Sequence, residues 1–196
     1  METDYVTFRL RADRSRYIAE RFGEYLQPTL LDVGCDRALL KDLLPLQEYM
    51  GVDMGGEPDL RMDLEAADRL PFGDRQYYAC VCSDVLEHLD NLHAMLAELV
   101  RVTERYLLIS LPNNWANARR PIERGKGCIA HYGLPVERPG DRHKWFFGFS
   151  EAREFLQAQC ERHPLTLKEL VANDKPRNVI VRTARHLRYP GERYLN

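Results

Sequence analysis

The sequence lacks several features that would place it in a specialised class. No apolar run approaches the roughly 18 residues that a membrane-spanning helix needs, and the opening METDYVTFRLRADRSR holds no apolar segment of the secretory kind. The five cysteines are an odd number without framework spacing, which argues against a disulfide-stabilised domain. Neither charge dominates, since 28 basic residues face 30 acidic ones, so the chain is not a globally basic nucleic-acid binder. We expect a cytoplasmic protein with reduced thiols and no membrane segment.

What is present predicts one α/β domain. The chain has 196 residues, of which 44% are hydrophobic, and this suits a single domain over 1–196 with its own core. Apolar periodicity and Pro or Gly boundaries predict helices and strands that alternate. The helices are expected at 15–26, 38–44, 92–103 and 151–160, and the strands at 29–34, 49–53, 58–63, 77–83, 106–111, 165–171 and 178–183. This order predicts a Rossmann-like three-layer sandwich whose sheet is mainly parallel, with a late antiparallel strand.

Carboxylates follow the expected strands at the places where such folds bind ligands. Asp32 closes the first strand just before Gly34, and Asp53, Asp63 and Asp84 follow the next three. The carboxyl ends of parallel strands meet at one edge of the sheet, where open α/β folds bind their ligands. Aspartates at strand ends are often only turn formers or helix caps, but four in register favour a site for a nucleoside. Asp53 lies about 20 residues after the glycine turn, where a carboxylate accepts ribose hydroxyls.

With these residues in place, the chain resembles the class I S-adenosylmethionine-dependent methyltransferases. The resemblance rests on motifs in a fixed order and spacing, over roughly residues 28–115. They are Leu30-Leu31-Asp32-Val33-Gly34-Cys35, Gly51-Val52-Asp53, Asp63-Leu64, Leu70-Pro71-Phe72 and Asp84-Val85-Leu86-Glu87-His88-Leu89. Each motif alone is weak, whereas the ordered set is specific for the family and silent about the substrate. The resemblance implies S-adenosylmethionine as the cofactor and direct in-line methyl transfer as the reaction.

The resemblance also implies roles for individual residues. The backbone of Gly34 and Cys35, near Asp32, lines the methionine part of the cofactor. Asp53 holds the ribose, while Asp63 and the backbone of Leu64 contact the adenine.

On the acceptor side, the resemblance implies that Asp84 faces the methyl group and its acceptor. His88 is the expected general base or acceptor-orienting group. His143, in the later run Asp141-Arg142-His143-Lys144-Trp145, is a third candidate.

The sequence departs from the family pattern in the glycine turn. The family usually places glycines two and four residues after Gly34, where this chain has Asp36 and Ala38. Aspartate tolerates a left-handed backbone better than most residues, so the turn can survive. Asp36 nevertheless adds a carboxylate beside a site that receives the cofactor's own carboxylate. One alternative therefore stays open: a catalytically silent Rossmann-like binding or regulatory module.

A second alternative is a metal-dependent O-methyltransferase. Asp84, Glu87 and His88 are spaced i, i+3 and i+4, so their oxygen and imidazole groups could hold a divalent cation such as Mg²⁺ or Mn²⁺. The triplet resembles the metal-binding element of ubiquinone-type O-methyltransferases and of small-RNA 2′-O-methyltransferases, in which His143 would be the counterpart of a later histidine. A catechol-type enzyme belongs to the same reading. Metal-free members of the family carry the same letters, so the main prediction includes no metal.

Two segments remain to define the acceptor. Residues 1–27 are expected to form an N-terminal helical cap, and 113–148 an irregular acceptor-side insertion. The insertion has a net charge of +4 in a chain of −2, and aromatic residues are interleaved with its charges. Its charged residues are Arg119, Arg120, Arg124, Lys126, Arg138, Arg142 and Lys144 against Glu123, Glu137 and Asp141. A small anionic acceptor is therefore expected, nucleic acid stays open as a partner, and the oligomeric state is not predicted.

Overall fold

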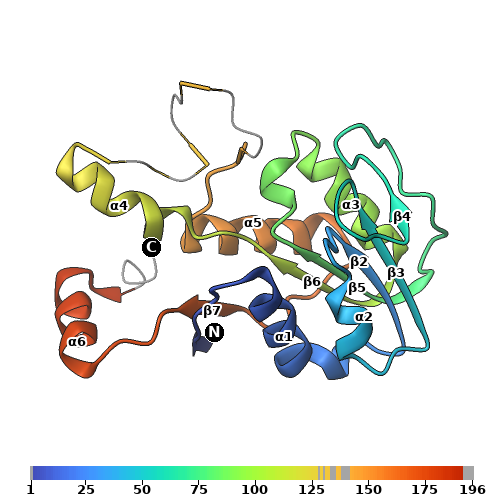
Figure 1. Cartoon of the computed structure of the whole chain (residues 1–196), viewed down its shortest axis with the longest axis horizontal. Helices are drawn as coiled ribbons and strands as arrows, with labels where there is room; N and C mark the ends of the chain where they lie inside the picture. Colours follow the sequence, from blue (N-terminus) through green and yellow to red (C-terminus); the bar gives the residue numbers. More distant parts are fainter. Residues whose placement is uncertain (1, 128, 130, 133–135, 138–141, 192–196) are drawn as a thin grey trace. The chain divides into compact units, whose positions relative to one another are not determined.

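The computed structural model describes residues 2–127, 129, 131–132, 136–137 and 142–191. Cys128, Arg138 and Asp141 lie outside these residues. The chain forms two compact units, Phe8–Leu111 and a second made of Met1–Thr7 with Pro112–Asn196, and each is described by itself (Figure 1). No helix in the described ranges combines the length and the apolar character that crossing a bilayer requires.

The unit Phe8–Leu111 is built on a five-stranded sheet. Its strands are β2 (Thr29–Val33), β3 (Glu48–Asp53), β4 (Leu60–Arg61), β5 (Tyr77–Ser83) and β6 (Thr103–Ser110). Its helices are α1 (Arg11–Phe22), η1 (Gly23–Tyr25), α2 (Leu39–Leu43), η2 (Leu86–His88) and α3 (Leu92–Val102). The strand order is β4-β3-β2-β5-β6 and every pairing is parallel. This confirms the expected Rossmann-like fold with a mainly parallel sheet.

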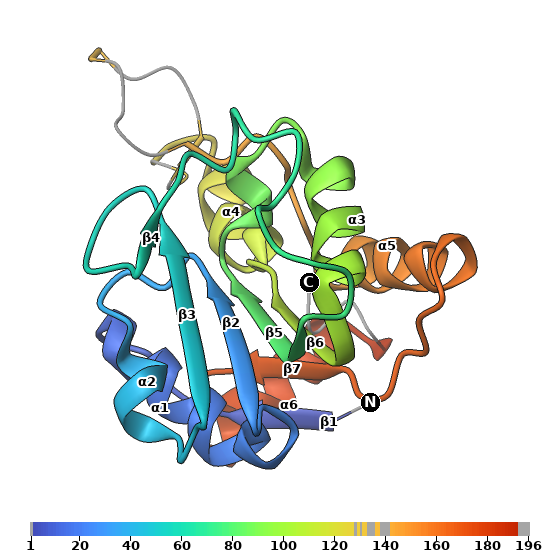
Figure 2. The same cartoon turned by 90° about the vertical axis from the view of Figure 1, so that its right-hand side faces the viewer.

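Both faces of this sheet are covered, as a parallel sheet requires. Alternate residues of the strands point to opposite faces. On one face Leu30, Ala79 and Val81 pack against Ile18 of α1 and Leu40 of α2. On the other face α3 contacts β5 and β6 (Figure 2), and it buries five apolar side chains: Leu92, Met95, Leu96, Leu99 and Val102. The strands at the centre are thus buried on both sides, which explains their continuous apolar sequences.

The second unit has a smaller sheet and three helices. Its elements are β1 (Glu2–Tyr5), α4 (Asn114–Arg124), α5 (Phe149–Arg162), β7 (Val171–Asp174) and α6 (Val179–Arg188). Strand β1 pairs in parallel with β7, with Glu2 opposite Val171 and Tyr5 opposite Asp174. A strand near the start of the sequence therefore pairs with one that lies about 170 residues later, which the sequence patterns did not indicate.

The structure corrects two expectations about the later part of the chain. The predicted late antiparallel strand is not found among the described residues: β7 is parallel, and 178–183 begins helix α6. The β-branched run Val179-Ile180-Val181 is typical of a strand, but the side chain of Asn178 accepts a hydrogen bond from the Val181 N–H and starts a helix instead. The segment 113–148, expected to be irregular, begins with α4, whose N-cap Asn113 accepts from the Ala116 N–H.

The N-terminal helix was expected but misplaced. It was predicted at 15–26 with Ser15 as its cap, whereas α1 begins at Arg11. The carboxylate of Asp13 accepts hydrogen bonds from the N–H groups of Arg9 and Leu10, so it satisfies donors at the start of the helix. An acidic residue inside the first turn therefore does the work that the prediction assigned to a serine before it.

Candidate functional site

The candidate site lies at the carboxyl ends of β2 and β5 in the unit Phe8–Leu111. The chain builds the sheet outward from β2 to β4 and then returns to the other side of β2 with β5. This reversal of strand order separates the loops that follow β2 and β5, and open α/β folds bind ligands in the crevice so formed. The loops are residues 34–38 after β2 and residues 84–85 after β5.

The loop after β2 has a left-handed backbone at alternate residues. Gly34 has a φ of 82°, Asp36 of 47° and Ala38 of 52°. These are the three positions at which the family pattern expects glycine. Asp36 and Ala38 therefore adopt the backbone of the glycine turn without being glycine, and the turn keeps its shape. A non-glycine residue in this region carries a strain of about 1–2 kcal/mol, which is lower for aspartate.

Close packing explains why glycine is retained at two places around this loop. A Cβ at Gly34 would lie 2.1 Å from a methyl carbon of Val85, so the two loops of the crevice touch there. A Cβ at Gly56 would lie 2.1 Å from the carbonyl oxygen of Asp36. That carbonyl also accepts a hydrogen bond of 2.6 Å from the N–H of Glu57. The turn is thus fixed by the backbone of the loop after β3 and by the Val85 side chain from the loop after β5.

Asp53, at the end of β3, joins its own loop to the loop after β2. Its Oδ2 accepts a 2.9 Å hydrogen bond from the N–H of Asp36, and its Oδ1 accepts a 3.0 Å bond from the N–H of Gly55. A carboxylate oxygen has two lone pairs, so each oxygen can accept one more hydrogen bond. Asp53 is half-buried, and two oxygens held side by side fit the two hydroxyls of a ribose.

Asp32 lies beneath the turn and is only 5% exposed. The hydroxyl of Tyr49 donates a 2.8 Å hydrogen bond to its Oδ2. Burial raises the pKa of Asp32 to about 7, the bond from Tyr49 opposes this rise, and the nearby charge of Asp53 adds to it. Burial, together with Asp32 and Asp53, also raises the pKa of the neighbouring Cys35 thiol to about 12. The protonated thiol is a poor nucleophile, so Cys35 offers the site its backbone.

Two arginines of α1 contact the two loops of the crevice. Arg11 lies 3.6 Å from a carboxylate oxygen of Asp36, and Arg14 forms an ion pair with Asp84. Residues three apart lie on one face of a helix, so this face of α1 is directed at both loops. Arg11 offsets the charge that Asp36 adds beside the site.

Asp84 is held from two sides. Its Oδ1 accepts a 2.6 Å hydrogen bond from the hydroxyl of Ser110, at the end of β6, while Arg14 contacts the other oxygen. Its φ of 54° is left-handed, and its N–H donates to the carbonyl of Ser110. The carboxylate of Asp84 therefore has a fixed position in the loop after β5.

The loop after β4 holds the residues expected near the adenine. Asp63 is exposed, and its Oδ1 accepts a 3.0 Å hydrogen bond from the N–H of Glu65, as in a simple turn. Leu64 is buried and its carbonyl accepts a bond from the side chain of Asn91. Asp63 thus stabilises a turn, which is a common role of an aspartate at the end of a strand.

Glu87 and His88 lie on η2, directly after the β5 loop. Glu87 is 1% exposed and His88 is half-buried, and one ligand atom from each lies within 4.8 Å of the other. Asp84 is not part of this pair, since its oxygens contact Ser110 and Arg14. His143 belongs to the second unit, where it is buried and its ring stacks on His131 at 4.1 Å and meets the ring of Tyr132 edge-on.

Sequence reasoning missed Arg14, Tyr49 and Ser110. Arg11 and Arg14 precede the helix predicted at 15–26, so no sequence pattern placed them on one helical face near the strand ends. Tyr49 was placed on a strand, but its partner Asp32 is 17 residues away and no local pattern links them. Ser110 was predicted only as part of the strand at 106–111.

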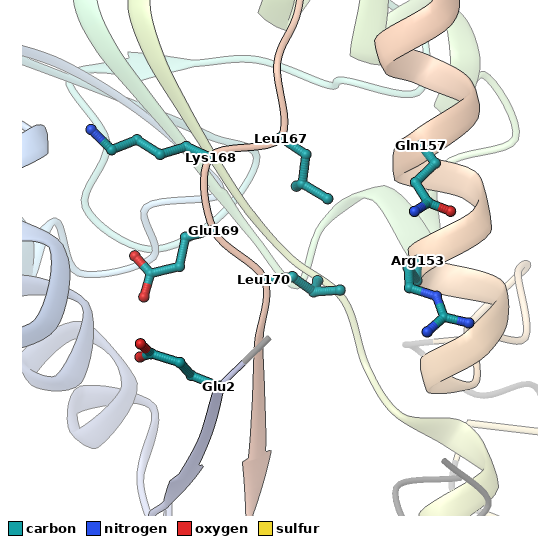
Figure 3. A pocket seen from close by; sticks show the side chains of 7 residues that line it. All are labelled: Glu2, Arg153, Gln157, Leu167, Lys168, Glu169 and Leu170. Carbon is teal, nitrogen blue, oxygen red and sulfur yellow. The ribbon is translucent and has the colours of Figure 1, made fainter. Parts of the chain in front are cut away.

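The second unit contains a hollow of about 360 Å³ (Figure 3). Leu167 and Leu170 give it an apolar part, and the side chains around them carry both signs of charge. Its lining residues are Glu2, Arg153, Gln157, Leu167, Lys168, Glu169 and Leu170. None of the residues expected in the site line this hollow, so it is separate from the carboxyl-end crevice.

Comparison with protein families gives a match over the core of the first unit. Residues 31–106 match the model of a methyltransferase domain. They run from β2 into β6 and include both loops of the crevice. Among curated proteins, no sequence matches this chain.

Solved structures share the fold. One comes from the complex between the Haloferax volcanii Trm112 methyltransferase activator and a protein classed as a methyltransferase, with 15% identity and a TM-score of 0.51. The match covers 75% of this chain and 65% of that one. Another is the small RNA methyltransferase HEN1, with 21% identity and a TM-score of 0.55, which covers 83% of this chain but only 23% of the other. This chain thus corresponds to less than two thirds of either protein's length.

Proposed function

We propose that this chain is a class I methyltransferase that transfers a methyl group from S-adenosylmethionine to a small anionic acceptor. The match of residues 31–106 to the model of a methyltransferase domain supports the proposal. The turn after β2 carries the proposal, because residues 34, 36 and 38 retain the left-handed backbone of the glycine pattern. A chain that had lost its cofactor would have no need of this strained turn. The substitutions Asp36 and Ala38 therefore do not by themselves favour a catalytically silent module.

The carboxyl ends of β2, β3 and β4 would hold the cofactor. Asp53 would accept the ribose hydroxyls with the lone pairs that its two backbone hydrogen bonds leave over. The backbone of Gly34 and Cys35, with Asp32 buried beneath it, would line the methionine part. Asp63 and the backbone of Leu64 would contact the adenine. When bound, S-adenosylmethionine supplies an electrophilic methyl group on a sulfonium.

Asp84 and His88 would act on the acceptor. Ser110 and Arg14 hold Asp84 in place, so it can accept a hydrogen bond from the acceptor and orient it. His88 would take up the proton at a ring nitrogen when the acceptor is a hydroxyl or an ammonium group. His143 is the third candidate for the acceptor side, proposed on the sequence motif alone.

The charge of the second unit supports an anionic acceptor. Helix α4 and the residues after it expose three cationic side chains: Arg120, Arg124 and Lys126. Arg119, on the same helix, stacks its guanidinium over the ring of Tyr189 at 4.0 Å. Cations and aromatic rings in one segment suit a phosphorylated or carboxylated metabolite, a sugar nucleotide or RNA.

Calorimetric titration with S-adenosylhomocysteine tests the proposal. Binding with one site per chain is expected, and the absence of heat at millimolar ligand would overturn it. Turnover is tested separately, by transfer of a labelled methyl group to pools of anionic metabolites and short RNAs. Binding without transfer to any pool would favour the silent module over the enzyme.

A metal-dependent O-methyltransferase is the second candidate. It is favoured by the buried carboxylate of Glu87, which lies near an imidazole nitrogen of His88. Carboxylate and imidazole ligands suit Mg²⁺ or Mn²⁺ in 2′-O-methyltransfer to RNA or in catechol-type methylation. Methyl transfer with and without EDTA separates the two candidates, because only this one predicts that chelation stops the reaction.

A further inference from the structure

Helix α6 has an unusual orientation on its unit. Its most exposed apolar side chains are Ile180, at 77%, and Leu187, at 80%, with Val179 at 63%. Ile180, Thr183, Ala184 and Leu187 are spaced three, four and seven residues apart, so they form one stripe along the helix. We call this stripe the apolar face of α6. All four of its residues are exposed.

The opposite side of α6 is cationic and faces the protein. Arg185 lies 3.3 Å from a carboxylate oxygen of Asp174, and the guanidinium of Arg182 lies over the ring of Tyr5. At the end of the helix, Glu123 of α4 contacts Arg188 at 3.3 Å and accepts a 2.7 Å hydrogen bond from the hydroxyl of Tyr189. Polar contacts thus attach α6 to its unit, whereas surface helices normally bury their apolar side.

We propose that the apolar face of α6 lies on the surface of a membrane that contains anionic lipids. An amphipathic helix with cationic residues binds a bilayer by burying its apolar side at the headgroup boundary, and anionic lipids strengthen the attachment. Such a helix lies in the plane of the membrane and does not cross it, so α6 does not need the length or the apolar character of a membrane-spanning helix.

The positive charge around α6 favours an anionic membrane as the partner of its apolar face. Residues 175–190 contain five basic residues and no acidic one. Two carboxylates contact three of these cations: Asp174 contacts Arg177 and Arg185, and Glu123 contacts Arg188, so the charge around α6 remains positive. Lys175, just before the helix, is exposed, and an anionic bilayer complements this positive charge. A second copy of the chain is disfavoured as the occupant, because a symmetric contact through α6 would bring two segments of the same charge together. RNA would be attracted by the charge, but it would leave the apolar face uncovered.

Sedimentation with lipid vesicles tests the proposal. The wild-type chain is expected to pellet with phosphatidylcholine vesicles that contain phosphatidylglycerol, and much less with phosphatidylcholine alone. Leu187→Ser should weaken this partitioning at least about fivefold, since a leucine loses most of its favourable transfer energy. Val136→Ser is the matched control, because Val136 is a fully exposed apolar residue of the same unit. Circular dichroism checks that both variants are folded.

A second pair of variants tests the charge. Lys175→Gln should reduce binding to the anionic vesicles several-fold and weaken its dependence on salt. Arg162→Gln, an exposed cation at the end of α5, should have no effect. No pelleting with either vesicle, or equal pelleting with both, would overturn the proposal.

Other occupants give different results. A dimer in light scattering that Leu187→Ser converts to a monomer, without vesicle binding, would identify self-association and overturn the proposal. Binding of a short single-stranded RNA without vesicle binding would likewise overturn it. None of these measurements uses the cofactor, so the outcome is independent of whether methyl transfer is found.

Discussion

The two units of this chain differ in charge, sheet and chemistry. Residues 8–111 carry 19 acidic and 12 basic residues, whereas the rest of the chain carries 11 acidic and 16 basic ones, so the near-neutral total conceals −7 and +5. The acidic unit holds the parallel sheet, the family match and the strand-end carboxylates. The basic unit has a two-stranded sheet and presents cations and apolar side chains outward. The residues that match the methyltransferase model all lie in the acidic unit, so that match says nothing about the cations and apolar side chains of the basic unit.

The largest change is expected for Asp32→Asn, which tests how the free energy of unfolding of the acidic unit depends on pH. Its pKa is raised to about 7 by burial, above an ordinary value of 3.8. A raised carboxyl pKa stabilises the fold most below pH 4, and this contribution is lost as pH rises through about 7. Three pKa units correspond to about 4 kcal/mol. Asp32→Asn should remove this loss, which is checked by urea unfolding followed by circular dichroism between pH 4 and pH 8.

The contribution of Asp32 is isolated by comparison with an exposed carboxylate. Asp68→Asn changes a surface residue of the same unit and should leave the pH dependence of unfolding as in the wild type. Equal slopes for Asp32→Asn and the wild type would contradict the assignment.

Gly34→Ala is expected to be the next largest effect. The new Cβ would lie 2.1 Å from a methyl carbon of Val85, and the alanine would have to adopt a φ of 82°. We expect a loss of about 3 kcal/mol in the free energy of unfolding, from steric overlap and left-handed strain together. Gly55→Ala is the control, since nothing lies within 4 Å of a Cβ added there. If both variants lose the same free energy of unfolding, the loss at Gly34 does not come from its contact with Val85.

Asp53→Ala tests whether the acidic unit is the cofactor site. Two hydrogen bonds to a carboxylate would be lost, so the affinity for S-adenosylhomocysteine should fall about 100-fold. The measurement is calorimetric, with Asp68→Ala as the matched exposed aspartate. An unchanged affinity would place the ribose elsewhere. The same titration of Arg120→Ala, in the basic unit, should give the wild-type value, and this sharpens the contrast between the units.

The smallest expected effect is a gain. Ala38→Gly should raise the free energy of unfolding by about 0.5 kcal/mol, because release of the left-handed strain slightly exceeds the entropy that glycine loses on folding. Ala19→Gly, in the middle of α1, has the opposite sign and should cost about 1 kcal/mol. Thermal unfolding of both variants checks the pair, and a loss in Ala38→Gly would mean that the turn is not strained.

The helices and strands of the acidic unit were predicted from the sequence far more accurately than those of the basic unit. Strands such as Thr29–Val33 and Tyr77–Ser83 are short apolar runs closed by a glycine or an aspartate, and their order alone implied a parallel sheet. Asp53 could be named because its place after a strand fixes where it lies. The contacts of Tyr49 and Ser110 could not be, since they join residues 17 and 26 positions apart in the chain.

The basic unit resisted prediction for a physical reason. The pairing of β1 with β7 joins segments about 170 residues apart, and neither strand has the apolar alternation of a core strand. Helix α6 was mistaken for a strand because its β-branched residues are typical of sheets, whereas the cap at Asn178 and contacts made by its arginines decide its form. Sequence patterns indicate which side of an element is buried, but α6 turns Arg182 and Arg185 toward its unit and leaves its apolar residues exposed.

The alternating left-handed residues have a consequence for the genetics of this protein. Codons for aspartate and for alanine each lie one base from a glycine codon, so the all-glycine turn needs only one base change at each of positions 36 and 38. A chain that keeps Asp36 and Ala38 therefore carries a backbone strain that is easily removed and has not been removed. Searches that require the glycine letters would miss such proteins, while a search on backbone dihedral angles would find them.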